Sequence, residues 1–370
     1  MKKLIKVLAL MLIFSTLFSL VSCKKNKNGD GGDGFVWDPY PYEDLGAFLT
    51  LPDYKSYTIS QAFIDSEINI ILASLYEEQT LYIDVTSGRG VRKWDYVKLD
   101  FSSITVGGET LYPVPEGEEG VDGINENFSE FTVGTGAALP DFENAVLDMT
   151  LSSEKEITFT FSDDYTAVPE CAGKEGVFKF KLASHGEPPV LDDDICHRFT
   201  PYPTPDAMRQ ALEQEIIYTN FWDYMYEKSV LKARPEKEYG EYYNGFVDVL
   251  KSYAKNNGKT LEEYVTTEGQ NFPSMGLYEG ITMDEFYRLA EEYADNNLKN
   301  DLILYSLIRA EGLQTSGGLY DAAQRELLLS YGIGYTIDSL YEQYGKEQTI
   351  TSIMDIQVRK RVIKYVTKTA

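Results

Sequence analysis

Apolar residues recur at every third or fourth position shortly after residue 60. The residues that keep this spacing between positions 60 and 78 are Phe63, Ile64, Ile68, Ile71, Leu72 and Leu75. A repeat near 3.6 residues is that of an α-helix with one buried face. The pattern therefore predicts an amphipathic helix over residues 60–78.

The repeat changes to two residues after position 93. Apolar and polar residues alternate in four segments, 96–101, 128–133, 156–161 and 177–182. This alternation predicts strands, and a short helix is expected between the second and third of them, at 141–149 after Pro140. Strands that accompany a single helix without βαβ alternation indicate an α+β fold, in which an antiparallel sheet wraps on that helix.

The pattern becomes helical again after residue 190. Thr260 and Thr282 are each followed by Glu at the third position, which is the capping-box pattern of a helix start. The helix after Thr282 keeps one apolar face until Gly312, and further helices with breaks near 332–334 and 345 are expected. An all-helical domain should therefore occupy the C-terminal part of the chain.

The N-terminus has the pattern of a bacterial lipoprotein signal. A basic start precedes an apolar run from Val7 to Leu20, which is too short for a convincing membrane-spanning helix. Leu20-Val21-Ser22-Cys23 then resembles a lipobox, although an ordinary signal peptide with a chance cysteine is the alternative. We therefore expect a signal peptide at 1–22, lipid attachment at Cys23 and a flexible tether over 23–50. Such a protein is anchored to the cell membrane on its extracytoplasmic face.

Composition excludes several classes of function. The 370 residues include 59 acids and 34 Lys and Arg, and the resulting net charge of −25 disfavours nucleic acid as a partner. The acidic loop at 116–123 lacks the ligand spacing of an EF-hand, so it is expected to be a solvated loop. His185 and His197 are the two histidines, too few for a His-based metal cluster or a Ser-His-Asp set. We therefore expect no metal and no cofactor.

The remaining cysteines leave two possibilities open. Cys171 and Cys196 can pair in an exported protein, or they can be buried free thiols. Their spacing does not identify a redox pair or a metal site.

Four segments, in this order, resemble a known family: VKLDF (97–101), ALPDFENAVLDM (138–149), FTFSDDY (159–165) and AGKEGVFKF (172–180). They are similar to the FK506-binding-type prolyl isomerase domain of bacterial trigger factor. Residues 204–370 likewise resemble the C-terminal chaperone domain of that family, in GKTLEEYV (258–265), LKNDLILYSLIRAEGL (298–313) and VRKRVIKYV (358–366).

The resemblance implies a domain organisation. Residues 91–190 would be the FKBP-type isomerase-like domain, and residues 191–370 the helical chaperone domain. Residues 51–90 would be a helical segment that packs with the C-terminal domain. No segment resembles the ribosome-binding domain of the family, so no ribosome docking is expected.

The resemblance also implies peptidyl-prolyl cis-trans isomerase activity. Rotation about an X-Pro bond faces a barrier of about 18–20 kcal/mol, and a dry aromatic pocket can favour the twisted amide without any nucleophile. Seven positions match the pocket of the family: Phe101, Leu111, Phe131, Leu139, Phe142 as its floor, Tyr165 and Phe178. The alternative for each is a role in the core of a small sheet–helix domain.

Some positions depart from the family pattern. Asp141 replaces the glycine before Phe142, and Leu111 stands where an aromatic residue is usual. Ser102-Ser103 replace the usual Thr-Gly after the first strand. A carboxylate beside the pocket floor would raise the local polarity, and the loss of an aromatic wall would weaken apolar packing on proline. The departures therefore predict reduced isomerase activity.

The helical domain is expected to hold unfolded segments by non-directional burial of apolar surface. The candidate client-binding residues, on predicted helices at 204–230 and 320–345, are Phe221, Trp222, Tyr224, Tyr226, Tyr331 and Tyr335. Ordinary helix packing is the alternative role for each of them.

These expectations combine into an extracytoplasmic, membrane-anchored foldase. Its partners would be unfolded exported polypeptides and their X-Pro segments. The alternative is a binding-only lipoprotein with a degenerate isomerase pocket. A solute-binding lipoprotein is disfavoured because the predicted order of strands and helices lacks two parallel-sheet lobes.

Overall fold

The computed structural model describes residues 44–114, 116, 121, 128–332 and 334–370. The expected signal peptide, Cys23 and most of the acidic loop at 116–123 lie outside these residues. The described chain forms two compact units, a sheet unit of residues 62–213 and a helical unit of residues 44–61 and 214–370. The sheet unit is thus an insertion within the helical unit. The domain limits expected at residues 90 and 190 remain a prediction.

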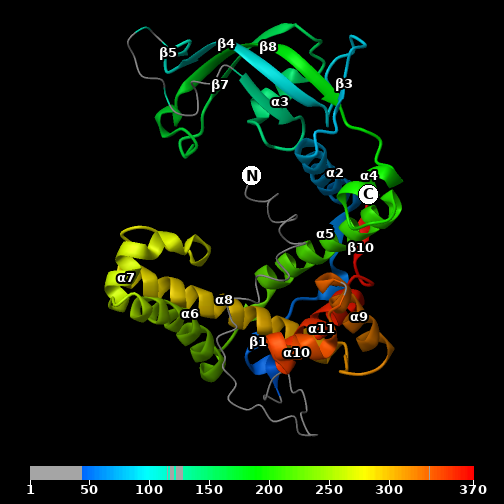
Figure 1. The fold of residues 1–370 in the computed structure, drawn as a ribbon, viewed down its shortest axis with the longest axis vertical. Coiled ribbons are helices and arrows are strands. Elements are labelled where there is room, and N and C mark those ends of the chain that lie inside the picture. Colours follow the sequence, from blue (N-terminus) through cyan, green and yellow to red (C-terminus); the bar gives the residue numbers. More distant parts are fainter. Residues whose placement is uncertain (1–43, 115, 117–120, 122–127, 333) are drawn as a thin grey trace. The chain divides into compact units, whose positions relative to one another are not determined.

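The sheet unit is built on an antiparallel sheet of six strands (Figure 1). Its strands are β3 (Ile83–Asp84), β4 (Tyr96–Val106), β5 (Glu109–Tyr112), β6 (Phe128–Thr132), β7 (Glu154–Thr160) and β8 (Glu175–Glu187). β4 pairs with β5, β6 and β8, and β8 also pairs with β3 and β7. Val97 and Leu99 on β4 are buried between more exposed neighbours, as the two-residue repeat predicts.

One short helix, α3 (Pro140–Val146), packs against this sheet (Figure 1). Pro140 occupies the first turn of the helix, where its missing N–H leaves no intrahelical bond unmade. The helix ends three residues earlier than predicted, because Leu147 leaves helical geometry and Asp148 adopts a φ of 63°. The expected α+β class, with an antiparallel sheet wrapped on one short helix, is confirmed.

Besides the 3₁₀ helix η3 (Pro169–Cys171), three further helices contribute to the sheet unit. They are α2 (Gln61–Glu78), α4 (Asp193–Phe199) and the first part of α5 (Pro205–Lys228), which continues into the helical unit. α2 agrees closely with the predicted helix, and Ile64, Ile68 and Leu75 on its apolar face are buried. Asp192 caps α4 by accepting a 2.9 Å hydrogen bond from the backbone N–H of Ile195.

Helices dominate the helical unit, which also contains two short sheets. The helices are η1 (Leu45–Ala47), η2 (Tyr54–Ser56), α6 (Glu236–Asn256), α7 (Leu261–Glu268), η4 (Gly269–Asn271), η5 (Pro273–Met275), α8 (Met283–Ala310), α9 (Gly318–Tyr331), α10 (Ile337–Tyr344) and α11 (Lys346–Val362). The strands are β1 (Leu49–Thr50), β2 (Thr58–Ser60), β9 (Val230–Leu231) and β10 (Thr367–Thr369). β1 pairs with β9 and β2 with β10, so the segment before the sheet unit joins the C-terminal part of the chain.

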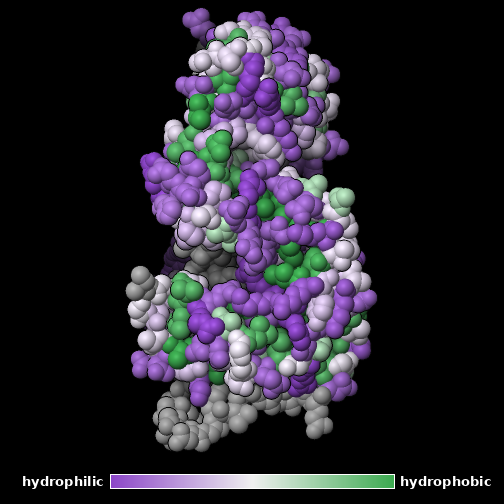
Figure 2. Space-filling model, turned by 90° about the vertical axis from the view of Figure 1, so that its right-hand side faces the viewer, coloured by the Kyte–Doolittle hydropathy of each residue, from purple (hydrophilic) through white to green (hydrophobic). Residues whose placement is uncertain are grey.

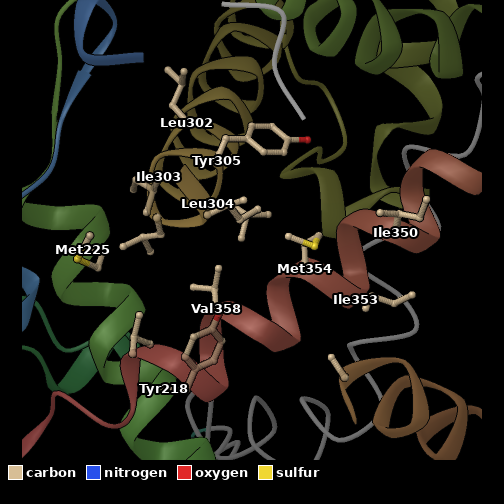
Figure 3. Close-up of a cluster of buried hydrophobic side chains, with 14 of the residues drawn as sticks. Tyr218, Met225, Leu302, Ile303, Leu304, Tyr305, Ile350, Ile353, Met354 and Val358 are labelled. Carbon is tan, nitrogen blue, oxygen red and sulfur yellow. The ribbon is translucent and has the colours of Figure 1, made fainter. Parts of the chain in front are cut away.

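Two apolar cores stabilise the helical unit. α6, α7 and α8 enclose one core, and α6 and α8 run side by side (Figure 1). The larger core gathers side chains from α5, α8 and α11, including Met225, Leu302 and Val358 (Figure 3). Among the described residues, no helix is both long and apolar enough to cross a membrane.

Candidate functional site

Phe142 lies at the centre of a cluster of aromatic rings in the sheet unit. Its ring centroid is 5.9 Å from that of Phe101 and 5.0 Å from that of Phe178, with interplanar angles of 86° and 82°. Phe159 and Phe180 lie 5.7 and 5.8 Å from the same ring. Edge-to-face contacts place the positive edge of one ring on the negative face of another, which stabilises this arrangement. Phe142 therefore forms the base of an apolar, aromatic patch.

All seven residues that the sequence predicts for the pocket belong to one apolar cluster. Three of them, Phe131, Phe142 and Phe178, are only 4%, 8% and 6% exposed. The other four are half-buried: Phe101, Leu111, Leu139 and Tyr165. The buried side chains can form a floor, and the half-buried ones offer surface that a bound apolar group can cover.

A β-bulge sets the position of Phe101. On β4, Phe101 pairs with Phe180 and Ser103 pairs with Lys179, so Ser102 has no partner on β8. The Ser102 hydroxyl donates a hydrogen bond of 3.3 Å to the carbonyl oxygen of Lys179. A bulge changes the direction of the strand and of the side chains beside it. The Ser-Ser departure from the family pattern thus falls on the bulge beside a pocket residue.

Three phenylalanines of the cluster were not predicted as pocket residues. Phe180 contacts Phe142, and Phe159 stacks on Phe178 with 5.3 Å between centroids. Phe161 lies 4.8 Å from the ring of Tyr165. The signal was present in the sequence, since residues 159 and 161 alternate with polar residues on one predicted strand.

The two acids in the first turn of α3 have different surroundings. Asp141 is exposed to solvent, so its carboxylate is not part of the apolar cluster. Glu143 accepts hydrogen bonds from the backbone N–H groups of Gly134 (3.0 Å) and Gly136 (2.8 Å). Both glycines have a left-handed backbone, with φ of 92° and 72°. Glu143 therefore holds the loop that leads to Leu139. The exposed position of Asp141 does not support the predicted rise in polarity at the pocket.

Tyr165 supplies a polar group at the edge of the aromatic cluster. Burial raises the pKa of its hydroxyl, so the group is neutral at physiological pH. Its hydroxyl makes no hydrogen bond with the other described residues, and it can therefore donate one to a bound carbonyl group. The arrangement can bind an apolar ring and one polar group, and it contains no activated nucleophile.

Both cysteines of the described chain are buried free thiols. Cys171 and Cys196 are not joined to each other, which resolves the alternative left open by the sequence. Burial raises the pKa of both thiols, which keeps them protonated and poorly nucleophilic. No group of three or more His, Cys, Asp or Glu that could hold a metal ion is found in the part of the chain that the structure describes.

The α5 residues expected to bind clients take part in packing. Phe221 is 0% exposed and belongs to the larger core. The indole N–H of Trp222 donates to Oδ1 of Asn300 at 3.0 Å, and the hydroxyl of Tyr226 donates a 2.5 Å bond to Asn296. The ring of Tyr224 lies 5.0 Å from that of Tyr57, so this group offers little free apolar surface.

Other aromatic and apolar side chains of the helical unit are more accessible. Tyr335 is 42% exposed and lies 5.4 Å from the half-buried ring of Tyr331. Leu329, in the same part of the chain, is 81% exposed, and Tyr253 and Tyr278 are 47% and 54% exposed. The last three were not predicted, since exposure of single apolar residues has no signature in a periodic pattern. On the face drawn in Figure 2, hydrophobic areas lie between hydrophilic ones.

Comparison with known proteins agrees with the resemblance seen in the sequence. No protein-family model matches the chain. The chain is 25% identical over 328 residues to the trigger factor of Caldicellulosiruptor bescii, with 85% of this chain and 69% of that protein covered. It is 24% identical over 332 residues to the trigger factor of Bacillus subtilis, with 85% and 71% covered. The chain is thus similar to trigger factors over most of its length.

The relationship to trigger factors is distant and partial. The alignment with the trigger factor of Desulforamulus reducens, at 24% identity over 279 residues, spans 72% of this chain and 59% of that protein. A solved structure of the trigger factor chaperone, from work on its promiscuous substrate recognition, aligns with 85% of this chain and 72% of its own. That alignment has 14% identity and a TM-score of 0.30.

Proposed function

We propose that this trigger factor relative is a foldase that isomerises X-Pro bonds and holds unfolded polypeptides. The aromatic floor at Phe142, beside the half-buried Phe101, Leu139 and Tyr165, is the observation that carries the proposal. A proline ring packs on such a floor, and exclusion of water favours the twisted amide, whose charge separation is smaller than that of the planar form. The barrier of about 18–20 kcal/mol can then fall without a nucleophile or a cofactor.

The holding activity is assigned to the helical unit. Leu329, Tyr335, Tyr253 and Tyr278 expose apolar or aromatic surface that can cover unfolded segments of many sequences. Tyrosine suits this role because its ring provides contact area while its hydroxyl keeps its hydrogen bonds with water. Binding of this kind needs no defined geometry in the client.

The proposed location is the extracytoplasmic face of the cell membrane. The support is the sequence of residues 1–22 and the lipobox-like Leu20–Cys23, with lipid attached at Cys23. The clients would be exported polypeptides, whose X-Pro bonds isomerise in tens to hundreds of seconds without a catalyst. Ribosome docking is not part of the proposal.

A binding-only protein is the second candidate, and Leu111 favours it. This residue stands where the family usually has an aromatic side chain, and in the structure it is half-buried against the Phe142 cluster. The loss of one aromatic wall reduces the contact with a bound proline ring.

Refolding of a client with a slow X-Pro phase separates the two candidates. The rate of the slow phase reports isomerisation, and the yield of folded client reports holding. We expect the full chain to raise both, and Phe142→Leu to lower the rate while it leaves the yield unchanged. Phe246→Leu is the matched control, since Phe246 is similarly buried, at 4% exposure, in the α6–α7–α8 core. A raised yield with an unchanged rate would identify a binding-only protein, and no effect on either would refute both candidates.

A further inference from the structure

The sheet unit contains a cavity that shares no residue with the Phe142 cluster. Its volume is about 330 Å³, which is in the range of small-ligand sites. Tyr76 of α2, Tyr82 and Trp94 contribute aromatic walls. The rest of the lining comes from the segment 188–191, from Pro205 and Arg209 of α5, and from Asn69, Leu72 and Ala73 of α2. The cavity therefore combines an apolar, aromatic surface with one cationic side chain.

Trp94 occupies this lining in an unfavourable backbone conformation. Its φ is 76°, in the left-handed region that favours glycine. The N–H of Asp95 donates to the carbonyl of Arg92 at 3.1 Å, which places Trp94 at the third position of a tight turn. The N–H of Trp94 also donates to the carbonyl of Val133 at 2.8 Å and fixes this geometry. A large side chain at a glycine-like position carries a steric cost, as is common at ligand sites.

Four hydrogen-bond donors of the lining have no acceptor among the described residues. They are the side-chain amide of Asn69, the hydroxyl of Tyr76, the indole N–H of Trp94 and the solvent-exposed guanidinium of Arg209. Burial raises the pKa of Tyr76 to about 12. The positive charge of Arg209 has the opposite effect on this pKa, because it favours the ionised hydroxyl. The nearby Asp192 carboxylate is already engaged as the cap of α4.

Arg209 is exposed to solvent, and no acid within the described residues forms an ion pair with it. Its guanidinium is therefore accessible to a ligand that enters the cavity. An arginine beside other donors is suited to a carboxylate, which accepts two parallel hydrogen bonds from its guanidinium. The rim adds apolar surface, since Val190 is 85% exposed.

We propose that this cavity binds the carboxylate of an aromatic or aliphatic acid. Arg209, Tyr76 and the indole N–H of Trp94 would bind the carboxylate, and the rings of Tyr82 and Trp94 would cover the apolar body. A single capped aromatic residue fits the volume. The same chemistry is offered by a free small acid and by the C-terminal residue of a polypeptide. The site is independent of the isomerase and holding activities proposed above.

Titration calorimetry and NMR of the full chain test this site. The probes are N-acetyl-phenylalanine, its amide, which lacks the carboxylate, and a peptide that ends in a free phenylalanine. We expect the acid to bind and to shift the indole resonance of Trp94, and the amide to bind about tenfold more weakly or less. Comparison of the peptide with the small acid then distinguishes the two sources.

Three variants complete the test. Arg209→Met should weaken binding about tenfold or more, and Arg325→Met, which removes an exposed arginine of α9, should leave it unchanged. Trp94→Gly supplies the residue that the left-handed backbone favours, so it should remain folded and lose affinity. Equal binding of acid and amide, full affinity in Arg209→Met, or the absence of binding would each overturn the proposal.

Discussion

The hydroxyl of Tyr54 donates a 2.5 Å hydrogen bond to Oε1 of Glu311, a residue 257 positions away. The hydroxyl of Tyr365 and Nε of Arg361 donate to Oε2 of the same carboxylate, at 2.6 and 3.0 Å. Nζ of Lys55 lies 3.2 Å from Oε1, and the Glu311 side chain is only 3% exposed. One carboxylate therefore joins the segment before the sheet unit, the end of α8 and the C-terminal segment.

Glu311 should make the stability of the helical unit depend on pH. Burial alone would raise its pKa, but the hydrogen bonds from Tyr365, Tyr54 and Lys55 outweigh burial and lower the pKa from 4.5 to about 2. A carboxyl with a lowered folded-state pKa stabilises the fold above its unfolded pKa, and this contribution is lost as pH falls toward 2. A shift of this size corresponds to about 3 kcal/mol.

Glu311→Gln should therefore lower the free energy of unfolding at pH 7 by about 3 kcal/mol and flatten its decline between pH 4.5 and 2. Urea denaturation at a series of pH values measures both effects. The control is Glu342→Gln, an exposed acid of α10, which should change stability by less than about 0.5 kcal/mol. Equal effects of the two variants would show that the Glu311 contacts contribute nothing.

Glu143→Ala should loosen the loop before α3. The variant removes both acceptors of the Gly134 and Gly136 N–H groups, and hydrogen bonds to a charged group contribute about 1.5–3 kcal/mol. We expect faster hydrogen exchange at these two amides and several-fold lower isomerase turnover, because Leu139 follows the loop. Glu143→Gln keeps one oxygen acceptor, so its amide exchange rates and turnover should lie between those of the wild-type chain and Glu143→Ala. Unchanged exchange in Glu143→Ala would contradict the assignment.

Asp141→Gly should have little effect on catalysis. The substitution restores the glycine of the family pattern, but Asp141 is already exposed and outside the aromatic cluster. We expect isomerase turnover to change by less than about twofold, and stability to fall by about 0.5–1 kcal/mol because glycine is unfavourable in a helix. A large rise in turnover would instead show that the carboxylate impairs the pocket.

Leu329→Ser with Tyr335→Ser should weaken holding. Both side chains are exposed, so the double variant should remain folded, and it removes apolar contact with clients. We expect suppression of aggregation to need about two- to fivefold more protein. Full burial of such a side chain contributes about 1.5–3 kcal/mol, and only part of this free energy is lost when the client contact is removed. Leu151→Ser, at a 48% exposed leucine of the sheet unit, is the control and should be neutral. Equal suppression by both variants would exclude this surface.

Local patterns predicted the parts of the fold that depend on neighbouring residues. The capping box of Thr260 and Glu263 is present with both of its hydrogen bonds. At Thr282 only half of the predicted box is present: the side chain accepts from the N–H of Glu285, but the carboxylate of Glu285 pairs with Arg288. β4 extends to residue 106 rather than 101, because the bulge at Ser102 shifts the two-residue repeat and hides the second half of the strand.

Contacts between distant residues could not be predicted in this way. The bond from Tyr54 to Glu311 spans 257 positions, and no periodic pattern links them. The contact of Phe142 with Phe178 depends on how the sheet curls around α3, so only a resemblance to a family brought these residues together in advance. The role of Glu143 was missed because an acid in the first turn of a helix is ordinary in sequence.

Exchange spectroscopy of a short X-Pro peptide tests the central claim most directly. NMR cross peaks between the cis and trans forms report isomerisation alone, without a protease or a folding client. The account predicts that the full chain, at catalytic amounts, accelerates exchange, that Phe246→Leu retains this rate, and that Phe142→Leu lowers it about tenfold or more. No acceleration by the wild-type chain, or equal acceleration by Phe142→Leu, would contradict it.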